Sequence, residues 1–241
     1  MTEGVVLELD DADSYLKLLR EGDSQPRVAF LRSFHHRLGP IARQLAKTHR
    51  ALARLAVISR DERHGTVHLM LHAGFNSVFS SLLLLIEGYP LAAGHLMRHY
   101  AEASAMALLI LDDDPNVWNA FDRDRTKYPV HKATHRLLQT NTAGRLRRLL
   151  GFDVDAWRRF LAIERFYEGF SHATAFSLGF HIMVDRPGVN ILGPEFDPGK
   201  RKQLSIELRR RRSALRPLTD LVRATHRVVS ERLRRGGLTR A

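Results

Sequence analysis

The chain has 241 residues, of which 44% are hydrophobic and 27% charged, and its formal net charge is +12. This composition excludes a mostly disordered polypeptide and is sufficient for one large helical domain. Because the chain has no cysteine, disulfide frameworks, thiolate nucleophiles and cysteine-based zinc sites are also excluded.

The N-terminal region contains neither a basic segment nor a long apolar stretch between Met1 and Asp11. We therefore expect no signal peptide and a cytoplasmic location. The most apolar run, Ala73 to Ile86, contains four Asn or Ser residues. It is shorter than the about 20 residues of a membrane span, so it is interpreted as a buried core helix and no membrane association is expected.

Apolar residues recur at helical spacing along most of the chain, and prolines or glycines stand between the periodic stretches. The first predicted helices are 10–21, 25–59 with a kink at Gly39-Pro40, 62–87 and 90–112. Two or three short helices follow in 113–151, with breaks near Pro115, Pro129 and Gly144. A long helix is predicted from Asp153 or Asp155 to about Met183, and the final helix covers 200–235 with a possible bend at Pro217. Residues 185–199, rich in proline and glycine, are expected to form a loop. The pattern predicts an all-α, up-and-down helical bundle (1–199) with a long basic C-terminal helix (200–241) docked on it, as a single domain overall.

The basic C-terminal helix carries nearly all of the net charge. Residues 200–241 contain 14 Lys or Arg against three acids, which leaves the remaining 199 residues almost neutral. Such a helix attracts polyanions, and the arginines expected to contact nucleic acid are Arg209, Arg210, Arg211, Arg212, Arg216 and Arg223. Because the helix has no Phe, Tyr or Trp for base stacking, binding is expected to be led by the phosphate backbone. The alternative is a solvated face on a packed helix.

Ionisable side chains also lie within apolar helices. Arg98 and Glu102 share a stripe on the predicted helix 90–112, and Arg165, Glu168 and His172 share a stripe on the long helix. Such groups are costly to bury unless they are paired. One interpretation is that they neutralise one another between helices, and the other is that they form a functional site.

Arg165 and His172 suit metal-free RNA cleavage, because a guanidinium can hold a phosphate and an imidazole can move protons near neutral pH. An Arg and a His separated by six residues on a late helix of an all-α bundle resemble the motif of the HEPN superfamily. The run from Gly88 to Glu102 and the run from Tyr167 to His172 also resemble an uncharacterised bacterial family of helical bundles. The resemblance covers about residues 62–183.

The resemblance implies a metal-independent ribonuclease or RNA-binding protein of a toxin or defence type, acting as a homodimer. It implies phosphate binding by Arg165 and proton transfer by His172, with Glu102 and Glu168 orienting them and Arg98 beside them. Phe166 stands where active members usually carry a polar residue. A non-catalytic bundle that binds nucleic acid, RNA more than DNA, or a partner protein therefore stays open as the alternative.

Histidine pairs four residues apart are the last candidates. Both imidazoles of such a pair lie on one helix face, which suits metal ligation, but a chain with 13 His also produces such pairs by chance. The pairs are His68/His72, His95/His99 and His131/His135. No Glu-x-x-His motif occurs on the core helices, so we predict no metal and no cofactor.

Overall fold

Long helices form the framework of the protein, as the apolar periodicity predicts. The structure is a computed structural model that describes residues 24–112, 115–123, 140–152, 162–163, 166–167, 170, 179–184 and 194–238. Within these ranges the regular elements are all helical and no strand is present, which confirms the all-α bundle. The elements are α2 (Gln25–Ile58), α3 (Glu62–Ile86), α4 (Pro90–Leu111), α5 (Pro115–Arg123), α7 (Thr140–Leu150), η2 (Gly179–His181), η3 (Pro198–Lys200) and α10 (Arg201–Leu238).

Prolines and an aspartate mark where several helices begin. Proline occupies the first turn of α2, α4 and α5, where its missing N–H is not needed. Asp61 caps α3 by accepting a hydrogen bond from the main-chain N–H of His64 at 2.9 Å. Between α3 and α4, Gly88 adopts φ +91°, and its carbonyl accepts a hydrogen bond from Glu195 N–H at 3.1 Å.

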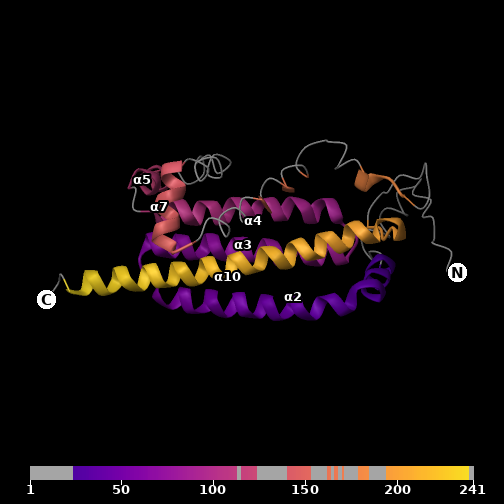
Figure 1. Cartoon of the computed structure of the whole chain (residues 1–241), viewed down its shortest axis with the longest axis horizontal. Helices are drawn as coiled ribbons and strands as arrows, with labels where there is room; N and C mark the ends of the chain where they lie inside the picture. Colours follow the sequence, from indigo (N-terminus) through magenta and orange to yellow (C-terminus); the bar gives the residue numbers. More distant parts are fainter. Residues whose placement is uncertain are drawn as a thin grey trace, which may run out of the picture.

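α2, α3 and α4 run up, down and up, and α10 returns alongside them after a long connection (Figure 1). α10 runs parallel to α2, since Arg37 contacts Ser205 and Thr48 contacts Thr219. It runs antiparallel to α3, since Ser81 contacts Arg211 and the α3 start lies beside the α10 end. α10 is therefore an integral member of the bundle.

One core is shared by all the long helices. Its buried side chains include Phe34 and Leu52 of α2, Leu71 of α3, Met97 of α4 and Leu215 of α10. Phe170 packs so closely on α4 that a Cβ added at Gly94 would lie 1.9 Å from its ring. The segment around Phe170 thus depends on a glycine in the facing helix.

Several predicted boundaries differ from the structure. Gly144 lies inside α7, so the predicted break there is wrong. Pro217 lies within the continuous helix α10. Pro40 lies within α2, and Figure 1 shows that α2 is bent in its first half, as the sequence predicted for Gly39-Pro40. Loss of one main-chain hydrogen bond accounts for such a bend. Residues 179–181 form the 3-10 helix η2, so an α-helix extending to Met183 is also wrong.

α3 is the one helix of the described residues that is long and apolar enough to cross a membrane by length and composition. The apolar run Ala73–Ile86, which is too short for a membrane span, is only part of α3, and the complete helix has 25 residues. In the structure, Val67, Leu71, Val78 and Leu82 of this helix are buried in the core. Core helices of soluble proteins have the same composition.

Candidate nucleic-acid interface

The predicted basic helix divides its arginines between the interior and the surface. Arg209, Arg212, Arg216 and Arg223 are exposed, and none has a hydrogen bond or ion pair within the described residues. They recur at steps of three, four and seven, so they lie on one side of α10. We call these four residues the α10 stripe. The stripe presents four cations along one exposed side of the helix.

Arg211 is the exception, and its predicted contact with nucleic acid is wrong. Its side chain is 0% exposed, and its Nη1 lies 2.6 Å from Oε2 of Glu207, which is also buried. Its Nε donates to Ser81 Oγ at 2.8 Å. A run of four arginines covers all sides of a helical turn, so one of them must face the core, and here it is Arg211.

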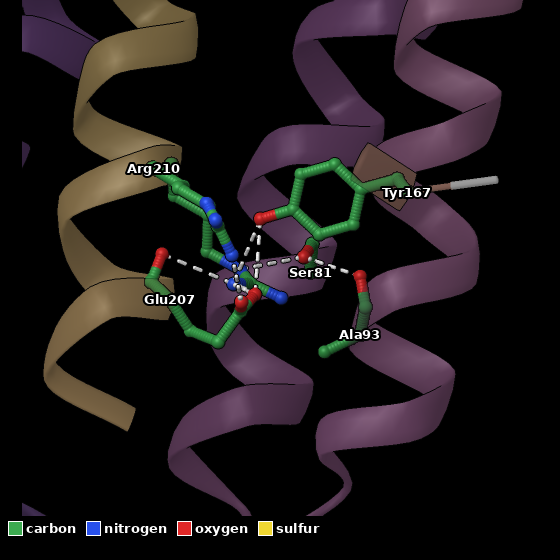
Figure 2. Close-up of polar contacts among 6 residues, drawn as sticks. Ser81, Ala93, Tyr167, Glu207 and Arg210 are labelled. Carbon is green, nitrogen blue, oxygen red and sulfur yellow. Dashed lines mark hydrogen bonds and ion pairs between the residues drawn. The ribbon is translucent and has the colours of Figure 1, made fainter. Parts of the chain in front are cut away.

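A polar cluster surrounds this buried guanidinium, and Figure 2 labels its members Ser81, Ala93, Tyr167 and Glu207. The Tyr167 hydroxyl donates to Glu207 Oε2 at 3.0 Å, and Ser81 Oγ donates to the Ala93 carbonyl at 2.6 Å. Burial raises the pKa of Tyr167 far above its ordinary value, so the phenol stays a neutral donor. Four parts of the chain meet at this cluster: α3, α4, α10 and the helical residues 166–167.

Arg210 occupies an intermediate position. Its guanidinium carbon lies 3.1 Å from the centroid of the Phe166 ring, and its Nη1 lies 3.3 Å from Glu207 Oε1. Stacking on an aromatic ring and an ion pair both hold the guanidinium in place. Arg210 is therefore committed to packing against the segment that contains Phe166.

A second cationic row lies on α2, and the sequence analysis missed it. Between Gln25 and Ile58 the chain has seven Lys or Arg residues and no acid. The exposed residues that have no hydrogen bond or ion pair within the described part of the chain are Arg32, Arg43, Lys47, Arg50 and Arg54. Their spacing places them on one side of the helix, and we call them the α2 stripe. When the charge is counted over residues 1–199 together, acids in other segments balance the positive charge of α2. A separate count for each predicted helix would have found it.

The two stripes lie at the same level of the bundle. Thr219, between Arg216 and Arg223, contacts α2 through Gln44 Nε2 at 2.9 Å and Thr48 Oγ1 at 2.7 Å. Gln44 and Thr48 lie between Arg43 and Arg50, so the stripes run beside each other along the parallel pair. At 100° per residue, both rows fall on the side of the pair that points away from α3 and α4.

Other arginines of the bundle donate to the ends of helices. Arg63 Nε donates to the Ile110 carbonyl and Arg232 Nη2 to the Leu111 carbonyl, each at 2.8 Å. Arg227 Nη2 donates to the Leu150 carbonyl at 2.6 Å. These guanidinium groups satisfy the unpaired carbonyls at the C-terminal ends of α4 and α7. These guanidinium groups therefore already have partners, whereas the cations of the two stripes have none within the described residues.

The other predicted site is only partly described. Arg98 Nε and Glu102 Oε1 form an ion pair at 2.9 Å within α4, with side chains 30% and 22% exposed. Arg165, Glu168 and His172 lie outside the described residues. A catalytic group that joins these five residues stays a prediction, although the direct pair on α4 already neutralises its two members.

The histidine pairs form no recognisable metal centre in the described ranges, where no group of three or more His, Cys, Asp or Glu is arranged to hold a metal. The rings of His68 and His72 lie 6.1 Å apart, and burial together with His72 lowers the pKa of His68. His99 Nδ1 shares a hydrogen bond with Ser77 Oγ at 2.7 Å. His131 and His135 lie outside the described residues.

Comparison with known proteins gives no relative from which a function could be transferred: no family model, curated protein or solved structure matches the chain. A functional proposal must therefore come from the arrangement of the chain's own residues.

Proposed function

We propose that this protein binds nucleic acid, RNA more than DNA, through the outer surface of the α2 and α10 pair. The supporting observation is the presence, in two adjacent rows, of nine exposed cations that have no partner within the described part of the chain. Releasing counterions from nucleic acid phosphates is the main source of affinity for such surfaces. Asp220, between Arg216 and Arg223, is the only acid within the span of either stripe.

RNA as the ligand also agrees with the HEPN-like pattern of Arg165 and His172. On this proposal the protein is a cytoplasmic helical protein of a toxin or defence type that acts as a homodimer. Phosphate binding by the stripes does not require catalysis, so the proposal includes a non-catalytic RNA-binding protein. The ribonuclease hypothesis is tested separately through His172.

The proposal is tested by fluorescence anisotropy with a labelled RNA at several salt concentrations. We expect the affinity to fall steeply as salt rises, with a linear relation between the logarithms of the two quantities. Lys47→Gln on α2 should weaken binding several-fold and reduce the salt slope by about 1. Arg123→Gln on α5, which removes an equally exposed charge away from both stripes, should leave the affinity unchanged.

Absence of RNA binding at about 50 mM salt would contradict the proposal, because screening is weak there. An acidic protein surface would then be the polyanion that the stripes fit. Equal loss of affinity in the Lys47 and Arg123 variants would indicate attraction to net charge alone and would also contradict a defined interface.

A further inference from the structure

The two stripes present two parallel rows of cations rather than a single row. Measured along each helix at 1.5 Å per residue, the α10 stripe extends over about 21 Å from Arg209 to Arg223. The α2 stripe extends over about 33 Å from Arg32 to Arg54, and the bend at Pro40 lies between Arg32 and the other members. Packed helices lie about 8–10 Å apart. The rows are therefore separated by a distance comparable with the about 6–12 Å width of duplex grooves.

We propose, resting on the function proposed above, that the ligand is a double-stranded nucleic acid with one phosphate strand along each stripe. A duplex presents two lines of phosphates flanking a groove, and both cationic rows can then be neutralised together. A single strand that follows one row leaves the other row without phosphates. The shared chemistry is the paired phosphate backbone, which both RNA and DNA duplexes provide.

The absence of exposed Phe, Tyr and Trp from α2 and α10 supports a duplex. Single-stranded nucleic acid is usually held by aromatic side chains on which its bases stack. The exposed large aromatic residues of the described part of the chain are Phe79 and Tyr89, which lie in α3 and in the turn after it. α10 contains no Phe, Tyr or Trp, and those of α2, Phe30 and Phe34, are buried. The surface can therefore contact backbones and has no Phe, Tyr or Trp platform for unpaired bases; the imidazole of His36 is exposed on the face of the α2 stripe.

The test compares a 20-base-pair duplex with its single strand, as RNA and as DNA, by anisotropy over a range of salt concentrations. If most of the nine cations contact phosphates, the logarithmic salt slope for the duplex should be about −6 to −8. A single strand along one stripe should give a slope of about −3. We expect the duplex to bind at least tenfold more tightly at about 0.1 M salt. A duplex preference for RNA over DNA supports the RNA ligand proposed above, and the reverse preference overturns that part.

Matched double variants separate the two stripes. The α2 pair Arg43→Gln/Arg50→Gln and the α10 pair Arg212→Gln/Arg216→Gln each remove two exposed charges. Each pair should reduce the magnitude of the logarithmic salt slope for the duplex by about 2, and the two pairs should weaken duplex binding by similar factors. The control pair Arg123→Gln/Arg148→Gln, on α5 and α7, removes the same charge and should have no effect. Glutamine, the replacing residue in all three double variants, favours helix about as well as arginine.

The outcomes distinguish this inference from the function on which it rests. Single strands that bind as tightly as the duplex, or duplex binding that depends on one stripe alone, would overturn the duplex ligand and leave nucleic-acid binding intact. Failure of every nucleic acid to bind at low salt would overturn both.

Discussion

The guanidinium of Arg211 and the carboxylate of Glu207 lie 2.6 Å apart inside the bundle, one turn from each other on α10. The side chains of Ser81 and Tyr167 complete the cluster from α3 and from the segment of residues 166–167. A buried charge pair is stable only when each member keeps its partners. The pair therefore fixes how α10 is rotated, and with it which arginines reach the surface.

Removing Arg211 should be strongly destabilising. We expect Arg211→Met to lower the free energy of unfolding by about 3–5 kcal/mol, because it removes the buried cation beside Glu207 Oε2 and leaves that carboxylate with only Arg210 and the Tyr167 hydroxyl as partners. The double variant Arg211→Met/Glu207→Met should recover most of this loss, since neither charge is then left without a partner. Urea denaturation followed by circular dichroism measures both. A double variant as unstable as the sum of the single ones would contradict this account.

Arg212→Met is the control for this series, because Arg212 is the exposed neighbour of Arg211 and has no partner within the described residues. Its effect on stability should stay within about 0.5 kcal/mol. If Arg212→Met were as destabilising as Arg211→Met, the burial of Arg211 would not be the cause.

Gly94 and Gly65 should respond oppositely to alanine. A Cβ at Gly94 would lie 1.9 Å from the Phe170 ring, whereas a Cβ at Gly65 would meet only the Ser59 carbonyl at 3.7 Å. Gly94→Ala should therefore destabilise the protein by about 1–3 kcal/mol through overpacking. Gly65→Ala should stabilise it by up to about 1 kcal/mol through helix propensity. Thermal melts compare the two, and a neutral Gly94→Ala would contradict the close approach of Phe170 to α4.

The cap at the start of α3 predicts a pH-dependent contribution to stability. Partial burial tends to raise the pKa of Asp61, but hydrogen bonds from the His64 main chain and ring outweigh it and lower the pKa below the ordinary 3.8. A carboxylate with a lowered folded-state pKa contributes stability above its unfolded pKa and loses it as pH falls through the folded pKa. Asp61→Ala should thus destabilise by about 1 kcal/mol at pH 7.

The same variant should differ less from the wild type below about pH 4, the ordinary pKa range of Asp. Asp61→Asn keeps a capping oxygen and should lose only a few tenths of a kcal/mol at pH 7. Denaturant midpoints at pH 7 and pH 3 measure these effects. A loss for Asp61→Ala that does not change with pH would show that the carboxylate charge plays no part.

His172→Ala tests the ribonuclease hypothesis. If His172 transfers a proton, the variant should cleave RNA about 10²- to 10⁴-fold more slowly than the wild type. RNA binding at high protein concentration should be retained, because the α2 and α10 stripes are intact. Gel assays over a broad RNA panel measure cleavage. Equal cleavage by both proteins, or none by either, would reject the enzyme and leave the binding proposal to be judged by its own test.

Most of the fold follows from local sequence signals. The starts of α3, α4 and α10 and their lengths agree with apolar periodicity, proline positions and the Asp61 cap, all of which act over a few residues. The break expected at Gly144 is wrong because packing of a helix against neighbours can outweigh the local preference of one residue, and Pro217 lies within the continuous helix α10. The parallel return of α10 depends on contacts between residues far apart in sequence, and periodicity carries no information about it.

The candidate interface could be predicted only in part, for a related reason. The positive charge of residues 200–241 is visible in the sequence, but the burial of Arg211 depends on Glu207, Ser81 and Tyr167 meeting in three dimensions. The α2 stripe was hidden because the acids that balance its charge in the overall count lie in other segments. Only the packing of α2 against α10 brings the two cationic rows together.

The parallel pairing of α2 with α10 also sets an order of events during synthesis. Thr48 and Thr219 are 171 positions apart in sequence, and contacts of such long range form late in folding. A chain still emerging from the ribosome carries the first cationic row but lacks the second until residue 223 has been made. If the surface binds nucleic acid as proposed, binding along both rows requires that α2 and α10 have both been synthesised and have packed together.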